Sequence, residues 1–182
     1  MFQVRIHGRG GQGVVTAAEL LSLAAFDEGH HAQAFPSFGS ERTGAPVVSF
    51  CRIADHPIRT REPIMRPDCL IVQDPTLLHQ VDLFSGLRDD GYLLINSSRE
   101  LEQLPDGQRR DRIRSVPASE LARQHMGRPV PNAALLGAFA ALTGVVSLAS
   151  VERAIRSRFP ARVADGNVAA AAAAYDLEPA HA

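Results

Sequence analysis

The hydrophobic positions of the chain follow two periods, one typical of strands and the other of helices. Residues 2–8, FQVRIHG, alternate between apolar and polar positions and predict a strand. Residues 13–29 carry an apolar stripe at helical spacing and predict a helix. Residues 30–35, HHAQAF, are expected to form a second strand. Strand, glycine turn, helix and strand in this order predict a βαβ unit, which requires a crossover and a parallel sheet.

The rest of the chain repeats this alternation of short apolar runs and helical segments. Further strands are expected at 45–53, 69–74, 91–96 and just after residue 112. Helices are expected at 75–84, at the end of 113–126, and at 132–146, 150–159 and 167–176, with Ser150 and Asn167 as the caps of the last two. The helix at 132–146 is apolar nearly all round, so it is buried on several sides or covered by another chain.

These elements predict an α/β protein with a single Rossmann-like, three-layer domain that spans residues 1–182. The sheet is expected to be mostly parallel, with helices on both faces. The length fits one domain, and the sequence contains no internal repeat and no segment that resembles a domain linker.

The composition narrows the chemistry. Hydrophobic residues make up 45% of the chain and aromatic residues only 5%, so the core is expected to be aliphatic. The formal net charge of −1 gives no indication of a nucleic-acid or membrane surface. All 19 basic residues are arginines, so the chain offers no phosphate-binding lysine, no Schiff-base lysine and no lysine general base.

Two cysteines, Cys51 and Cys69, lie 18 positions apart in apolar runs. An iron–sulfur cluster usually needs four cysteines, and a structural zinc needs four ligands with closely spaced pairs. The seven histidines show no metal-binding spacing, so we expect no metal site in this chain. Buried thiols, the lack of a long apolar span and the lack of a signal peptide lead us to expect a cytoplasmic protein.

A glycine-rich loop follows the first strand. Gly8, Gly10 and Gly13 form the pattern G-x-G-x-x-G, which in dinucleotide-binding proteins is accompanied by an acidic residue at the end of the second strand. Gln33 and Ala34 stand at that place here. Three interpretations remain open: a dinucleotide site, a tight turn only, or a site shared with another subunit. In each case the following helix N-terminus can bind an anion.

A second cluster of candidate residues lies in 35–46, FPSFGSERTGAP. This segment leaves the second strand at the same edge of the sheet as the glycine loop, where open α/β sheets form their ligand crevice. Ser37, Glu41 and Arg42 are therefore expected to face the glycine loop, unless Glu41 and Arg42 pair only with each other or with solvent. Asp74 follows a strand and is expected to cap a helix or to line the crevice.

Four segments together resemble one family. GRGGQGVVTAAELL (8–21), AFPSFGSERTGAPVVSFCRI (34–53), VQDPTLL (72–78) and NAALLGAFAALTG (132–144) are similar to the gamma subunit of 2-oxoacid:ferredoxin oxidoreductases, and most similar to its pyruvate branch. The resemblance extends over residues 2 to about 176, and the four motifs in this order are much more specific than any one of them.

The resemblance implies a multi-subunit enzyme that oxidatively decarboxylates a 2-oxoacid, most closely pyruvate, forms acyl-CoA and reduces ferredoxin. Thiamine diphosphate, Mg²⁺ and [4Fe-4S] clusters are then expected on alpha, beta and delta (or fused) subunits, with no cofactor and no catalytic residue in this chain. The residues expected to form coenzyme A or subunit-interface loops are Gly10, Gly11, Gln12, Gly13, Ser37, Glu41 and Arg42. A self-sufficient NAD(P)-binding domain and a pure assembly scaffold are the alternatives.

Overall fold

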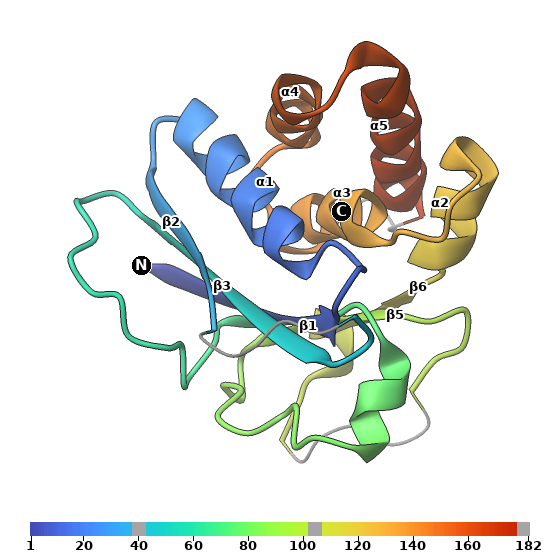
Figure 1. Ribbon diagram of the computed structural model, residues 1–182. Helices are drawn as coiled ribbons and strands as arrows, with labels where there is room; N and C mark the ends of the chain where they lie inside the picture. The colour runs from blue at the N-terminus through green and yellow to red at the C-terminus, as the bar shows by residue number, and fades with distance from the viewer. Residues whose placement is uncertain (38–42, 102–106, 178–182) are drawn as a thin grey trace.

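The computed structural model describes residues 1–37, 43–101 and 107–177 (Figure 1). Within these ranges the strands form one sheet in the order β2-β3-β1-β4-β5-β6. The strands are β1 (Phe2–Arg9), β2 (His31–Pro36), β3 (Pro46–Ala54), β4 (Cys69–Val72), β5 (Tyr92–Asn96) and β6 (Ile113–Val116). The α-helices are α1 (Val14–Asp27), α2 (Ala118–Met126), α3 (Asn132–Thr143), α4 (Leu148–Arg158) and α5 (Ala161–Asp176). Two short 3-10 helices are η1 (Pro75–His79) and η2 (Arg110–Arg112).

The sheet is mostly parallel, as the sequence predicts. β1 pairs in parallel with β4, β4 with β5, and β5 with β6, whereas β3 runs antiparallel to both of its neighbours. β3 therefore lies between β1 and β2. The predicted βαβ unit is wrong in this respect: β1 and β2 point the same way but do not touch, because residues 46–54 pair with both of them.

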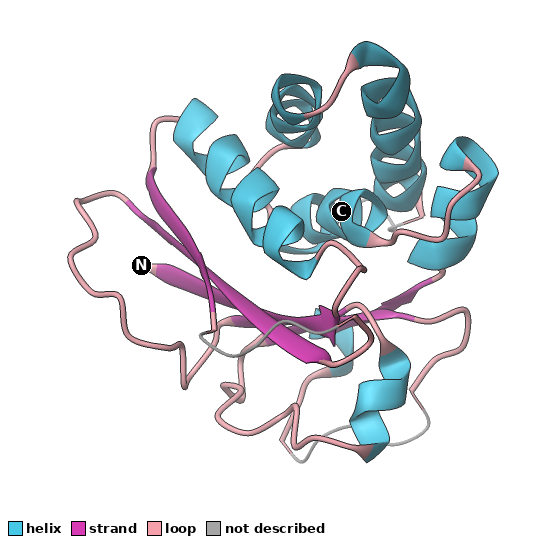
Figure 2. Ribbon diagram, viewed as in Figure 1, coloured by secondary structure: helices cyan, strands magenta, loops and turns pink. Residues whose placement is uncertain are grey.

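The two faces of the sheet are covered differently (Figure 2). The α-helices lie together on one face, where they share a large apolar core with the inward side chains of the strands. The opposite face packs a smaller apolar cluster against η1 and the chain that follows it. The α/β class and the three layers are confirmed, but the α-helices of the described residues all lie on the first face, and the second face is covered by loops and short 3-10 helical turns such as η1. The connection between β3 and β4 contains prolines at 57, 63 and 67, and prolines interrupt helices.

Helix α3 is buried by its own chain. Ten of its 12 residues are buried, among them Phe139 at the centre of the core. Gly137 allows α3 and α5 to approach closely, because a Cβ at this position would lie 1.9 Å from the carbonyl oxygen of Ala171 in α5. Of the two explanations for its apolar surface, burial on several sides is therefore the right one.

The ends of α4 and α5 differ from the prediction. Ser147, not Ser150, caps α4, and its hydroxyl accepts a hydrogen bond from the Ser150 N–H. Helix α5 begins six residues earlier than expected, so Asn167 lies inside it and donates to the Val163 carbonyl. Ser150 is instead buried, where its hydroxyl donates to the Glu28 carboxylate at the end of α1.

Cys51 and Cys69 lie on β3 and β4, on either side of Val4 of β1. Both thiols are free and buried, and burial raises the pKa of Cys51 to about 12. At neutral pH they therefore behave as small apolar side chains. No helix in the described ranges has both the length and the apolar composition needed to cross a membrane.

Candidate functional site

The glycine loop and the segment after β2 meet at the carboxyl edge of the sheet. Gly10 forms an isolated bridge with Thr43. The Gly10 N–H donates to the Ala45 carbonyl (2.9 Å), and the Gly44 N–H donates to the Gly10 carbonyl (3.2 Å). The structure therefore brings the two predicted loops together in the part that it describes. Glu41 and Arg42 lie outside the described residues.

Glycines shape the entry to α1. Gly11 and Gly13 have φ angles of 90° and 73°, a region that favours glycine. A Cβ on Gly13 would also lie 2.7 Å from the Nδ2 atom of Asn132, the first residue of α3. Among the described residues no side chain caps the start of α1, so its first backbone N–H groups can bind an anion.

A hydrogen-bonded clamp fixes the loop to the end of β4. Arg9 Nε and Gln12 Nε2 both donate to Asp74 Oδ2, at 3.1 and 2.8 Å, and Gln12 Oε1 accepts from the Arg9 N–H at 2.7 Å. Asp74 also caps η1 by accepting from the Thr76 N–H, so the expected capping role is confirmed. Gln12, which was predicted to belong to a coenzyme A or subunit-interface loop, therefore forms part of this clamp.

The clamp holds Asp74 in its charged form. Burial alone would raise the pKa of this carboxyl. Hydrogen bonds from Thr76 and Gln12, together with the nearby charge of Arg9, outweigh burial and lower the pKa below its ordinary value.

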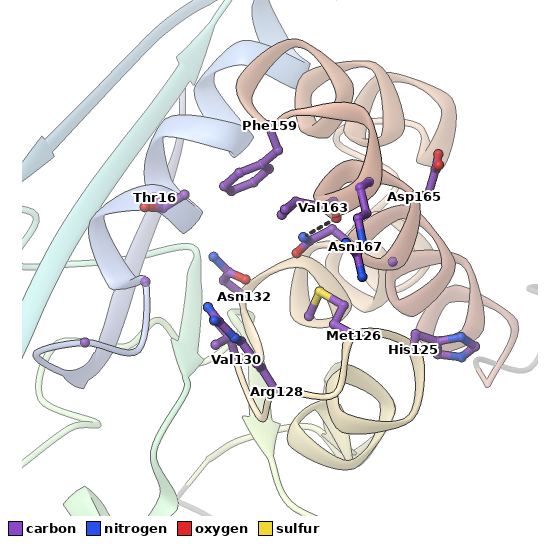
Figure 3. Close-up of a pocket in the computed structure, with 14 residues that line it drawn as sticks. Thr16, His125, Met126, Arg128, Val130, Asn132, Phe159, Val163, Asp165 and Asn167 are labelled. Carbon is purple, nitrogen blue, oxygen red and sulfur yellow. Dashed lines mark hydrogen bonds between the residues drawn. The ribbon is translucent and has the colours of Figure 1, made fainter.

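A cavity of about 840 Å³ opens beside the glycine loop, and we call it the helix cavity (Figure 3). It lies between the start of α1, the end of α2, the start of α3 and the first turns of α5. Its polar lining includes Thr16, Arg128, Asn132, Arg162 and Asn167. Apolar side chains such as Phe159 and Val163 complete the wall.

The charge around the helix cavity favours an anion. Arg128 and Arg162 are exposed, and their guanidinium groups have no recorded partner within the described residues. The carboxylate in the lining, Asp165, already forms an ion pair with Arg156 at 2.6 Å. Two unpaired arginines and an uncapped helix N-terminus together suit phosphate or carboxylate groups.

Two smaller cavities adjoin the glycine loop on its other sides. One, of about 520 Å³, is lined by Gly10, Gly11, Gly13 and Ser37, so four of the predicted residues surround one space. The other, of about 370 Å³, lies at the ends of β4 and β5 and is lined by Gln12, Asp74 and neighbouring polar residues. Asp74 thus also lines the crevice, in addition to its capping role.

The described residues contain no cluster of three His, Cys, Asp or Glu side chains that could hold a metal ion. His7 is buried at the end of β1, and burial, followed by the charge of Arg5, lowers its pKa to about 4. It is therefore neutral at physiological pH and belongs to the packed interior.

The strand order weighs against a dinucleotide site. In dinucleotide-binding folds the second strand lies next to the first, so that its acidic residue reaches the ribose. Here β3 separates β2 from β1, which places Gln33 about two strand spacings, roughly 10 Å, from β1. Both the missing acid and the displaced strand disfavour an NAD(P)-binding domain.

Most of the residues that line the helix cavity were not predicted from the sequence. Arg128, Asn132 and Arg162 come from segments more than 110 positions away from the glycine loop. A local signal was present for the first two: GRPVPN places an arginine and an asparagine directly before an apolar helix. No comparable signal marks Arg162, because nothing in the pattern places the start of α5 beside α1.

Comparisons with known proteins agree with this fold. Residues 3–177 match the family described as Pyruvate ferredoxin/flavodoxin oxidoreductase. The chain is 46% identical to pyruvate synthase subunit PorC of Methanothermobacter marburgensis, with 97% of each chain covered. It is 44% identical to the pyruvate/ketoisovalerate oxidoreductases common subunit gamma of Pyrococcus abyssi, covering 97% of this chain and 96% of that one.

A solved structure also resembles this chain over nearly its whole length. Pyruvate oxidoreductase subunit PORC of Thermotoga maritima superposes with a TM-score of 0.81 at 37% identity, covering 96% of this chain and 95% of that one. The chain therefore belongs to the pyruvate ferredoxin/flavodoxin oxidoreductase family, in which it is a gamma-type subunit of a multi-subunit 2-oxoacid:ferredoxin oxidoreductase. The resemblance drawn from the four sequence motifs is confirmed.

Proposed function

We propose that this subunit binds the anionic groups of coenzyme A for an oxidoreductase whose redox chemistry takes place on its partners. The partners, alpha, beta and delta or fused subunits, would carry thiamine diphosphate, Mg²⁺ and the [4Fe-4S] clusters and would pass electrons to ferredoxin. Pyruvate is the proposed 2-oxoacid, because all three relatives compared above carry pyruvate in their names, one of them together with ketoisovalerate. The cytoplasm is the proposed location, where the two buried thiols stay reduced.

One observation supports the coenzyme A proposal: Arg128 and Arg162 lie at the rim of the helix cavity beside the start of α1, and neither the two guanidinium groups nor that helix start has a side-chain partner among the described residues. Coenzyme A carries a pyrophosphate and a further phosphate on a long, partly apolar molecule. A cavity of about 840 Å³ with an apolar wall and a cationic rim suits part of such a molecule. The predicted residues Gly10, Gly11, Gly13 and Ser37 lie on the adjoining side of the same loop.

Replacement of Arg128 by Ala in the assembled enzyme tests this proposal. A hydrogen bond to a charged group contributes about 1.5–3 kcal/mol, so the KM for coenzyme A should rise roughly 10- to 150-fold. Arg162→Ala and Arg42→Ala should act in the same direction if their charges reach the same ligand. Steady-state kinetics with coenzyme A varied, at saturating 2-oxoacid, measures the effect.

The matched control is Arg123→Ala, which removes an exposed arginine from the same end of α2 outside the cavity lining. Reduction of the iron–sulfur clusters by the 2-oxoacid without coenzyme A should be unchanged in all of these variants. An unchanged KM for coenzyme A in an intact complex would reject the proposal. A parallel loss of assembly and of both half-reactions would instead support the scaffold alternative.

A further inference from the structure

Residues 55–68 connect β3 to β4 without forming a helix or a strand. In Figure 1 this segment, coloured teal to green, extends away from the sheet on the side of the N-terminus. Connections of this length without secondary structure are uncommon in compact domains, and they usually have a function. We call residues 55–68 the arginine loop.

Buried arginines of the sheet hold the arginine loop in place. Arg52, only 3% exposed, donates to the Glu62 carbonyl at 2.5 Å, and Arg5 donates to the Ile64 carbonyl at 3.4 Å. The Ile64 side chain is itself buried. Two guanidinium groups from the sheet thus bind main-chain oxygens of a segment that has no regular hydrogen bonding of its own.

A neighbouring segment closes over the loop from another side. Gly86, with φ 75°, approaches so closely that a Cβ there would lie 1.9 Å from the Met65 carbonyl oxygen. At the end of the loop, the Asp68 N–H donates to the Gln3 carbonyl at 2.8 Å. The backbone of the loop is therefore fixed, in contrast with a freely moving connection.

The fixed backbone presents basic and apolar side chains to solvent. Arg59, Arg61 and Arg66 are exposed, and their guanidinium groups have no recorded partner in the described part of the chain. Met65, next to Arg66 in the chain, is 71% exposed. Elsewhere on the surface, several exposed arginines pair with carboxylates, such as Arg153 with Asp27. The loop also carries three carboxylates, of which Asp55 pairs with His30, Asp68 pairs with Arg88 and Glu62 is exposed. Within the described residues, three arginines without a recorded partner therefore stand against one such carboxylate.

We propose that the arginine loop is a docking surface for an acidic face of a partner subunit in the assembly. Arginine and methionine are enriched at protein interfaces, and the planar guanidinium group binds carboxylates through two hydrogen bonds. A loop that is already ordered avoids the entropy that a flexible one loses on binding. The buried Arg5 and Arg52 therefore act as braces that keep the three exposed arginines ready for contact.

This surface is separate from the proposed coenzyme A site. The loop starts and ends at the amino edge of the sheet, level with Phe2 and Val4. The glycine loop leaves β1 at the opposite edge, after Arg9. The two proposals can therefore fail independently, since one concerns assembly and the other concerns a kinetic constant.

The test is the triple variant Arg59→Glu, Arg61→Glu and Arg66→Glu, co-expressed with the partner subunits of the complex. Like charges brought together at an interface oppose binding strongly, so the affinity of this subunit for the rest of the complex should fall about tenfold or more. Co-purification and the dissociation rate, measured at low and high salt, report this effect. The wild-type complex should weaken with salt, and the triple Arg→Ala variant should lose most of that dependence.

The matched control carries the same charge change at Arg99, Arg110 and Arg123, which are exposed and have no recorded side-chain partner in the described ranges. The control should assemble as the wild type does. As isolated chains, the control and the Arg→Glu variant of the arginine loop should both keep the wild-type melting temperature. Normal assembly of the arginine-loop variant would overturn the proposal. Equal loss in the control would overturn it too, because the effect would then come from net charge alone.

Discussion

Asp74 shows how one residue links the sheet to the candidate site. It follows β4 directly, and its carboxylate accepts hydrogen bonds from Arg9 and Gln12 of the glycine loop and from Thr76 of η1. Asp74 was predicted to cap a helix or to line the crevice, because an aspartate after a strand is common at both places. The hydrogen bonds of Arg9 and Gln12 to Asp74 could not be predicted, since these partners lie more than 60 positions away in the sequence.

Asp74→Asn should therefore destabilise the fold by about 1–3 kcal/mol at neutral pH, because an amide NH₂ then faces the Arg9 and Gln12 donors. Because its folded pKa lies below the ordinary value, ionised Asp74 contributes stability above its unfolded pKa of about 3.9. That contribution is lost as the pH falls through the folded pKa. Urea unfolding between pH 7 and pH 2 should show that the free energies of unfolding of the wild type and of Asp74→Asn become equal in acid.

Asp55→Asn is the control for this substitution. Asp55 has 91% of its side chain exposed and pairs with His30. Its substitution should change the free energy of unfolding by less than about 0.5 kcal/mol at any pH in this range. A difference between wild type and Asp74→Asn that stays constant down to pH 2 would contradict the role assigned to the charge.

Glycines explain why some elements were predicted well and others were not. The bounds of α1 and of the inner strands follow from local periodicity, and they agree with the prediction within a few residues. The start of α5 was missed because Gly166 and Asn167 resemble a helix boundary in sequence. In the structure, Gly166 lies within α5, where a Cβ would be 2.9 Å from the His125 carbonyl oxygen of α2. That requirement comes from packing between two helices and has no local signature.

Gly137→Ala tests the same kind of contact between α3 and α5. Alanine favours a helix over glycine by about 1 kcal/mol, yet its methyl group would overlap the Ala171 carbonyl oxygen. The helices must separate, so we expect a net loss of about 1–3 kcal/mol in the free energy of unfolding. Chemical denaturation measures this change directly. An increase in stability would mean that the two helices have room to move apart.

Across the whole molecule, the sequence predicted the class of fold and the meeting of two loops, but not the strand order or the helix cavity. The class follows from alternating apolar periods, and the meeting of the loops follows from strands that end at one edge. The insertion of β3 between β1 and β2 depends on pairing between distant segments. The helix cavity likewise depends on how α2, α3 and α5 pack around α1, which no local pattern encodes.

The burial of α3 also changes what is expected of the isolated chain. An apolar helix left uncovered would cause aggregation, but this one is enclosed by α5, α2, α4 and the sheet. Within the described residues, the large apolar side chains that remain exposed are spread over several elements: Met1, Leu23, Phe26, Met65, Val81, Val163, Tyr175 and Leu177. Single exposed apolar residues of this kind are normal on monomeric proteins.

We therefore expect the isolated subunit to be folded and monomeric. The partner contact proposed above, the arginine loop, is charged, and surfaces of that kind form separable interfaces more readily than obligate ones. Sedimentation velocity at increasing protein concentration should give one species of the monomer mass, and thermal unfolding should show one cooperative transition. Concentration-dependent self-association, or a chain that melts without a transition, would show that the core is completed only by another subunit.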